Sequence, residues 1–471
     1  MILFVSQFGE AVQILTEGKH RGTTMLGRKE LKKLSDGVLK RAGNDPAEVL
    51  IFSEVQNLTR FANNSIHQNV AERNVTLIMR LLQGKRIGLA TSNRLDAEGL
   101  GRLAERARHN AKVSPEDPDY PGLPEPADYP AVDGFDQQTA EYSPEDRAKA
   151  VRDLCRQTLE KGLNGSGLFS TGTSEIVIAN TRGLFAYHVG THADFQVLVA
   201  AEDSSGREQG SGWQVSNIPV ESLGRLAIKK AQDGRSPRSI DSGEYTVVLT
   251  PYATEDLLNM LNYYGMGAQA VLESRSWMCE RIGEKVVSTL VDIWDDGVDS
   301  AGLPTPFDFE GVPKRRVDIV EKGVVQGPVF DRITAKKMGE QTTGHALPPT
   351  MRSFGPIATN LFMAPGSSST EEMIKSTKRG LYISRFWYTR LVHPRDCVIT
   401  GMTRDGVFFI ENGELSYPVK DLRFTQSYVE ALSQVESVGN EPRLLMSEFG
   451  GQATRVPGLK ISTFTFTGLT V

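Results

Sequence analysis

Apolar side chains recur every three or four residues in several stretches of the first 240 residues, which is the spacing of an amphipathic helix. The predicted helices cover residues 28–40, 96–112, 143–161 and 220–232. The third has the clearest start. Ser143 precedes a proline and two acids, and these residue types favour a helix N-terminus.

Alternating or continuous apolar residues between these helices predict strands. The expected strands are 48–54, 59–68, 75–82, 86–90, 175–179, 184–189 and 195–201. The Gln83-Gly84-Lys85 turn should join two of them as a hairpin, and the polar Gly/Ser stretch 203–212 should be a loop. In the second half, a strand over 245–250 precedes a helix from about 254. Asp405-Gly406 and Asn412-Gly413 each predict a tight hairpin turn.

Strands and helices are mixed without regular βαβ spacing, which favours an α+β fold over a doubly wound sheet. We expect an N-terminal extension (1–25), an N-terminal α+β domain (26–240) and a C-terminal β-rich domain with helices (241–471). Six prolines between residues 114 and 130 exclude regular structure there. Segment 114–142 should therefore be an extended surface segment, either a wrap or a linker.

Composition narrows the class of protein. The chain has 53 basic and 58 acidic residues, a balance that argues against nucleic-acid binding. Its three cysteines form no CxxC pair, which fits a reducing compartment. No apolar run is long enough to span a membrane, and the N-terminus lacks the features of a signal peptide. We expect a cytoplasmic protein.

Local spacing reveals no catalytic centre. His188 and His192 should share one face of a strand, too far apart to hold one metal ion. Cys397 follows His393 by four residues, so the two could form a thiolate pair or simply belong to a turn. Asp295-Asp296 is best interpreted as a solvated strand end.

Several segments together resemble the landmarks of a known family. They are RFANNSIHQ (60–68), GSGLFSTG (165–172), NTRG (180–183), TGHA (343–346), and FFIENGE (408–414) followed by YPV (417–419). Their order is similar to that of the TldD/PmbA, or modulator-of-DNA-gyrase, family over nearly the whole chain. The resemblance implies a two-domain α+β fold, dimers, and a peptidase that cuts unfolded peptides. In that peptidase a zinc-bearing TldD-type subunit is paired with a TldE/PmbA-type subunit that lacks the metal ligands.

The resemblance also indicates which type of subunit this chain is. The active branch holds zinc with the two histidines of an HExxxH motif and a later cysteine, and that spacing would need a widened helical turn. Here Asn259 and Tyr264 stand at the histidine positions, Met260 at the glutamate and Ser447 at the cysteine. None of these can rebuild the site. The resemblance therefore implies a TldE/PmbA-like chain without a cofactor of its own, with zinc in its partner.

The resemblance further suggests residues of a peptide cleft: Asn63, Ser65, His67, Gly344 and His345. Each could instead play a structural part, with the amide and hydroxyl groups satisfying a strand end and the imidazoles packed inside. Two alternatives stay open for the whole chain. It could be a stand-alone homodimeric binding or regulatory protein, or an enzyme that uses Cys397 with His393 or His188 with His192.

Overall fold

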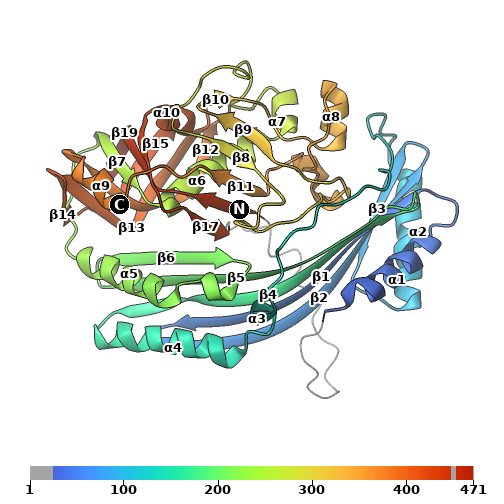
Figure 1. Cartoon of the computed structure of the whole chain (residues 1–471), viewed down its shortest axis with the longest axis horizontal. Coiled ribbons are helices and arrows are strands. Elements are labelled where there is room, and N and C mark those ends of the chain that lie inside the picture. The colour runs from blue at the N-terminus through green and yellow to red at the C-terminus, as the bar shows by residue number, and fades with distance from the viewer. Residues whose placement is uncertain (1–24, 447–451, 470–471) are drawn as a thin grey trace.

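The computed structural model describes residues 25–446 and 452–469, which form two domains (Figure 1). The expected N-terminal extension lies almost entirely outside this part. The N-terminal elements end with α5 (Val220–Asp233), and the C-terminal elements begin with β7 (Gly243–Leu249). The predicted boundary at residue 240 falls between them.

A six-stranded antiparallel sheet organises the N-terminal domain. Its strand order is β3-β2-β1-β4-β5-β6. The strands are β1 (Ala47–Ala62), β2 (Ser65–Gln83), β3 (Arg86–Ser92), β4 (Asn164–Asn180), β5 (Phe185–Ala200) and β6 (Ser205–Gly212). They are longer than the predicted strands because the main-chain pairing continues into polar residues on either side of each apolar segment.

One strand prediction and one loop prediction are wrong. The expected strand over 59–68 contains a turn at Asn63 and Asn64, whose φ angles are 51° and 58°. This two-residue turn joins β1 to β2, and asparagine tolerates the left-handed region better than most residues do. The expected loop over 203–212 is mostly the edge strand β6, held by main-chain pairing with β5.

Helices cover one face of this sheet. They are α1 (Gly27–Lys40), α2 (Ala97–Val113), α3 (Gln137–Ala140), α4 (Pro144–Glu160) and α5. The four longer helices match their predicted ranges closely, and the Ser143 hydroxyl caps α4 by accepting from the Asp146 N–H at 3.0 Å. The helices α1 and α2 bury one cluster of strand side chains, and α4 and α5 bury another.

The proline-rich segment wraps along the junction between the domains. The Tyr129 hydroxyl donates to the Gly311 carbonyl at 2.8 Å, and Arg332 donates to the Gly122 carbonyl at 2.6 Å. Asp117 and Arg352 form an ion pair. Of the two structures predicted for this segment, the wrap is correct.

Two further sheets build the C-terminal domain. One has the order β10-β9-β8-β11-β18-β17. In the other, β12-β7-β19-β15-β13 closes into a ring because β13 also pairs with β12, and β14 and β16 are attached to it. Together the two sheets contain β7, β8 (Ile293–Asp295), β9 (Val317–Glu321), β10 (Val324–Val325), β11 (Asn360–Met363), β12 (Arg379–His393), β13 (Val398–Glu411), β14 (Glu414–Pro418), β15 (Leu422–Ser427), β16 (Val435–Val438), β17 (Arg443–Met446), β18 (Ala453–Val456) and β19 (Leu459–Leu469).

Helices pack against and between these sheets. They are α6 (Pro251–Leu261), a π-helical turn (Asn262–Met266), α7 (Ala268–Leu272), α8 (Arg332–Met338), α9 (Thr370–Lys375) and α10 (Tyr428–Ser433). Stacked rings of Phe386 and Phe464, 5.3 Å apart, lie in the core. The α+β class with a β-rich C-terminal domain is confirmed. No helix in the described part of the chain is long and apolar enough to cross a membrane.

The two predicted hairpin turns of this domain have different outcomes. Asn412-Gly413 does join β13 to β14. Asp405-Gly406 lies inside β13, where both residues have positive φ and the register against β12 shifts. The prediction of a turn there is wrong, because the same left-handed preference also forms a β-bulge.

A buried charge cluster joins the domains. Arg80 on β2 lies 3.7 Å from the Glu48 carboxylate on β1 and 3.2 Å from Glu310 of the C-terminal domain. It also donates to the Tyr120 hydroxyl at 2.8 Å. Burial raises the pKa of Glu48 to about 7, with Arg80 opposing the shift and Glu310 and Asp308 adding to it. The junction therefore holds more carboxylate than one guanidinium can neutralise.

This cluster predicts a pH-dependent effect of Glu48→Gln. Because the folded pKa of Glu48 lies above its ordinary 4.5, wild-type stability falls as the pH rises from about 4.5 to about 7. The glutamine variant lacks that loss. Its free energy of unfolding, relative to wild type, should therefore rise by ~3 kcal/mol across this interval. Urea unfolding at several pH values measures the difference, and the exposed α2 residue Glu98, changed to Gln, is the control. A pH-independent difference would contradict the assignment.

Candidate functional site

The face of the N-terminal sheet that the helices leave open is polar over part of its length, whereas Leu50, Ile176 and Ile178 of the same face pack against Phe307 of the C-terminal domain. Alternate residues of each strand point to this face. The register places Gln56, Gly172 and His192 side by side across β1, β4 and β5, and Ser170, Asp194 and Ser211 across β4, β5 and β6. We call this surface the sheet floor. Figure 1 shows the C-terminal domain above the sheet and α4 below it.

Asp194 holds one edge of the sheet floor against the C-terminal domain. Its buried carboxylate accepts hydrogen bonds from Gln196 Nε2 at 2.7 Å, Gln209 Nε2 at 2.9 Å and Ser211 Oγ at 2.5 Å. In turn, Gln209 donates to the Met446 carbonyl, and the Met446 N–H donates to Ser211. The network therefore fixes the end of β17 beside β6.

His192 lies in the middle of the sheet floor. Desolvation lowers the pKa of its imidazole to about 4, so the ring is neutral near pH 7. The ring lies against Gly172, where a Cβ atom would approach His192 Cε1 to 2.4 Å and the Val55 carbonyl to 2.7 Å. The absence of a side chain at residue 172 therefore provides the space for this imidazole.

Gly172→Ala should consequently destabilise the domain. The new methyl group must displace the imidazole or separate two paired strands, a change that costs about 1–3 kcal/mol. Thermal and urea unfolding measure the loss. The matched control is Gly101→Ala on α2, where an added Cβ meets no atom within 4 Å. That change should be stabilising by ~0.5–1 kcal/mol because alanine favours a helix. Equal stabilities of the two variants would contradict the close approach.

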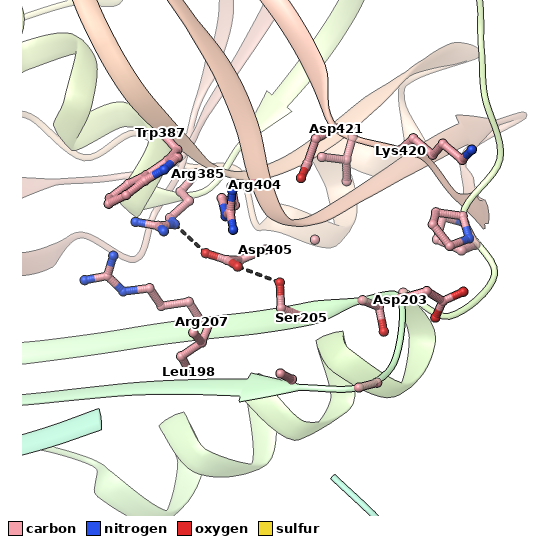
Figure 2. A pocket seen from close by; sticks show the side chains of 18 of the residues that line it. Leu198, Asp203, Ser205, Arg207, Arg385, Trp387, Arg404, Asp405, Lys420 and Asp421 are labelled. Carbon is pink, nitrogen blue, oxygen red and sulfur yellow. Dashed lines mark hydrogen bonds and ion pairs between the residues drawn. The ribbon is translucent and has the colours of Figure 1, made fainter. Parts of the chain in front are cut away.

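A cavity of about 620 Å³ opens at one end of the sheet floor, between β5 and β6 on one side and β12 and β13 on the other. Figure 2 shows Arg385 and Asp405 reaching from the C-terminal domain toward Ser205 and Arg207 on β6. Asp405 accepts from Arg385 Nε and from Ser205 Oγ, both at 2.6 Å. The Asp405 carboxylate thus joins the two walls.

The bulge in β13 places this carboxylate. Asp405 has a φ of 57° and Gly406 a φ of 120°, and the extra residue turns the Asp405 side chain out of the strand's regular alternation. Asp405 was not predicted from the sequence, although its Asp-Gly signal was recognised and misinterpreted. Ser205 was missed as well, because its strand was expected to be a loop.

Two arginines of the cavity wall contact the start of α6. Arg207 lies 5.1 Å from the ring centroid of Tyr252 and Arg385 lies 5.9 Å from it, both at cation–π distance. Tyr252 is in the first turn of α6. The same helix carries Asn259, so two arginines of the cavity wall contact the helix on which the degenerate motif lies.

The side chains at the motif positions contact other parts of the protein. Asn259 Oδ1 accepts from Thr454 Oγ1 at 3.1 Å, and Asn259 Nδ2 donates to Glu255 one turn earlier. Met260 is 8 % exposed, and the ring of Tyr264 meets that of Tyr263 edge-on at 4.9 Å. The π-helical turn that begins at Asn262 is the kind of widened turn that the HExxxH spacing requires.

These residues do not fit a zinc ion. An amide already bonded on both sides, a thioether and a phenol replace two imidazoles and a carboxylate, the groups that zinc chemistry uses. Across residues 25–446 and 452–469, no group of three or more His, Cys, Asp or Glu side chains could hold a metal ion. Ser447, at the predicted cysteine position, lies outside the described residues.

The predicted peptide-cleft residues fall in two places. Asn63, Ser65 and His67 are exposed at the β1–β2 hairpin and are not among the residues that line the cavity, although Asn63 accepts a hydrogen bond from Asn164, which pairs with the cavity residue Ala200. It is Asn64 that fixes the hairpin, since its side chain donates to the Leu163 carbonyl at 2.7 Å and accepts from the Gly165 N–H at 2.6 Å. From the sequence, Asn64 was given no role of its own.

Gly344 and His345 are inside the C-terminal domain. His345 is 1 % exposed, and its Nε2 lies 2.8 Å from Asp295 Oδ1 while its Nδ1 contacts Thr343 Oγ1 at 2.9 Å. Both residues are buried in the described chain, and His345 is a packed, hydrogen-bonded histidine, so their contact with a peptide stays a prediction. The interpretation of Asp295 as part of a solvated strand end is wrong, since Asp295 is fully buried.

The other candidate catalytic pairs do not form. Cys397 is fully buried, and desolvation raises the pKa of its thiol far above the ordinary value. His393 is exposed and lies 3.3 Å from Asp396 rather than bonding the thiol. His188 does share the face of β5 with His192, but it packs edge-on against Phe307 of the C-terminal domain. The hypothesis of a Cys397–His393 pair is wrong.

Comparison with known proteins gives a consistent result. Three models of the PmbA/TldA metallopeptidase match: domain 1 at residues 47–111, the central domain at 138–235 and the C-terminal domain at 242–468. A metalloprotease TldD homolog of Haemophilus influenzae is 24% identical over 385 residues, covering 78% of this chain and 79% of that one. The metalloprotease PmbA of Escherichia coli O157:H7 is 24% identical over 372 residues, covering 76% and 79%.

Solved structures share the fold. The crystal structure of TldE from Thermococcus kodakarensis superimposes with a TM-score of 0.85 at 21% identity, covering 93% of this chain and 100% of that one. A protein assigned as a modulator of a DNA gyrase from Thermotoga maritima gives 0.83 at 20% identity, with the same two coverages.

Proposed function

The chain belongs to the PmbA/TldD metallopeptidase family, and we propose that it is the subunit without zinc in a two-chain peptidase. A TldD-type partner would hold the metal and cut the peptide. This chain would form part of the wall that encloses an unfolded peptide. The observation that carries the proposal is the chemistry at Asn259, Met260 and Tyr264, where no side chain can replace an imidazole ligand or a general base.

The sheet floor supports the peptide-holding part of the proposal. An extended peptide presents alternating N–H and C=O groups, which need partners when they leave water. Neutral polar side chains such as Gln56, Ser170 and His192 can supply donors and acceptors without selecting a charge. Asn63, Ser65 and His67 remain a separate proposal for peptide contact at the β1–β2 hairpin.

We place this complex in the cytoplasm. All three cysteines are free thiols, and two of them, Cys155 and Cys397, are buried. Such a set is stable in a reducing compartment.

Elemental mass spectrometry of the purified, tag-free chain tests the metal assignment. After incubation with zinc and desalting, we expect negligible zinc. One tightly held equivalent would show that a ligand set exists and that the chain is a metalloenzyme in its own right.

Reconstitution tests the subunit assignment. Cleavage of an unfolded peptide should require both this chain and a TldD-type protein from the same source, and neither should suffice alone. If this chain neither binds the TldD-type protein nor changes its peptide cleavage, the chain is instead a stand-alone binding protein.

A further inference from the structure

Three arginines gather at one end of the cavity between β5, β6, β12 and β13. They are Arg207, Arg385 and Arg404, and all three line the cavity. Arg385 on β12 and Arg404 on β13 are direct cross-strand neighbours, and Figure 2 shows Arg207 on β6 across the cavity from them. Like charges in directly opposite positions destabilise a sheet unless negative charge lies beside them. We call this group of three side chains the arginine end.

Only part of this positive charge is balanced by a bonded carboxylate. Asp405 accepts from Arg385 Nε at 2.6 Å, and the Arg385 side chain is 8 % exposed. Arg404 is exposed, and its guanidinium makes no hydrogen bond or ion pair with any other described residue. Three guanidinium groups thus share one bonded carboxylate, which leaves the arginine end positively charged.

Neighbouring side chains hold two of the guanidinium groups in place. Arg385 lies 4.5 Å from a ring centroid of Trp387, and both Arg385 and Arg207 contact the ring of Tyr252. Arg207 also donates to Gln196 Oε1 at 3.0 Å. A guanidinium held on an aromatic face keeps N–H groups at its edge for an acceptor. The arginine end is therefore preorganised for a planar anion such as a carboxylate.

The other end of the cavity carries acids. Glu202, Asp203 and Asp421 belong to the lining, and Figure 2 shows Asp203 and Asp421 away from Arg207 and Arg385. Burial, followed by the charge of Asp405, raises the pKa of Asp421 to about 6, so this carboxyl is mostly ionised near pH 7. These acids would repel a ligand with several negative charges. A ligand with a single carboxylate suits both ends of the cavity.

We propose that the arginine end binds the C-terminal carboxylate of a peptide. The inference rests on the proposed function, since the peptide is the one that the two-chain complex would enclose. The cavity volume of about 620 Å³ lies in the range of small-ligand pockets, so the cavity has room for a chain end and not only for an ion. Gln196 follows Asp194 on the same face of β5 and also lines the cavity. A peptide extended over the sheet floor can therefore end at the arginine end.

Arg404→Gln tests the proposal by direct binding to the full chain. The two probes are an N-acetylated alanine dipeptide with a free C-terminal carboxylate and the same dipeptide as its C-terminal amide. Calorimetric titration should show that the wild-type chain binds the free acid on the order of tenfold more tightly, because hydrogen bonds between charged groups exceed neutral ones. Arg404→Gln should remove most of this difference and leave binding of the amide unchanged.

Arg423→Gln is the matched control. Arg423 is an exposed arginine of β15, the strand beside β13, and it is not among the residues that line the cavity. The variant has the same net charge as Arg404→Gln and should keep the wild-type preference. Equal affinities of the wild-type chain for acid and amide would overturn the proposal. A preference that survives Arg404→Gln, or no binding of either dipeptide, would overturn it as well.

Inorganic phosphate distinguishes a peptide end from another anion. Phosphate carries more negative charge than a carboxylate, so it should compete only weakly with the free-acid dipeptide. Tighter binding of phosphate would make the arginine end a phosphate site and overturn the proposal. Peptide cleavage with a TldD-type protein separates this inference from the subunit assignment. A chain that prefers the free acid but supports no cleavage keeps the carboxylate site and loses the subunit role, whereas cleavage without that preference removes the site alone.

Discussion

Replacing Arg80 with methionine is expected to lower the free energy of unfolding by about 3–5 kcal/mol, the range found when one partner of a buried ion pair is removed. The Arg80 side chain is 2 % exposed and lies between Glu48 and Glu310, which come from different domains. Methionine fills similar space but leaves both carboxylates buried without the guanidinium that lies between them. The loss should appear in urea unfolding at pH 8 and should come with easier separation of the two domains.

The control for Arg80 is Arg86→Met on β3. The Arg86 side chain is 44 % exposed, and its ion pair with Glu116 spans 3.7 Å. An exposed pair of this kind contributes roughly 0–1 kcal/mol. In the Arg80→Met background, Glu48→Gln should recover part of the loss because it removes one uncompensated charge. No recovery, or equal effects of the two arginine substitutions, would contradict the cluster.

The elements that the sequence predicts correctly are those whose formation depends on residues close together in the chain. Helix α4 begins where Ser143 can cap it and where proline suits the first turn. The Asn412-Gly413 turn needs only two residues that tolerate positive φ. The same local signal misleads at Asp405-Gly406, because whether such residues form a turn or a bulge depends on the pairing of the strands on either side.

The functional surfaces were predicted less well because long-range contacts build them. Ser205 and Asp405 are 200 residues apart and meet only after both domains have folded. β6 is polar and glycine-rich, so its strand character comes from pairing with β5 and not from its own residues. His345 was assigned to a cleft because a polar residue in a family motif suggests a function. Its contact with Asp295, 50 residues away in the chain, could not be predicted from sequence spacing.

The positions of the missing metal ligands, in contrast, were predicted from the resemblance alone. Asn259, Met260 and Tyr264 were identified from a resemblance that extends through neighbouring residues, and the structure adds why that alignment is physically sensible. The π-helical turn that begins at Asn262 supplies the wider turn that the HExxxH spacing needs, even though no histidine is present to use it. The chain thus has a wide turn where the resemblance places the motif, without the histidines of that motif.

The wide turn at Asn262 leads to a prediction about zinc binding. The triple variant Asn259→His, Tyr264→His and Ser447→Cys should bind about one equivalent of zinc after desalting, whereas the wild-type chain should retain almost none. Three ligands of these types are the usual protein contribution to a zinc site with an open position. Elemental mass spectrometry and a competition assay with a chromogenic chelator measure the stoichiometry and the affinity.

The controls for the zinc variant separate ligand chemistry from simple surface binding. The double variant Asn259→His and Ser447→Cys keeps two ligands and lacks the residue that the widened turn is expected to bring near the site, so it should lose most of the affinity. Adding His to an exposed turn elsewhere, as in Asn63→His, should give no retained zinc. If the triple variant folds, as its circular dichroism and unfolding midpoint report, and still holds no zinc, then residues 259, 264 and 447 do not come together as a zinc site. The absence of zinc chemistry would then lie in the backbone as well as in the side chains.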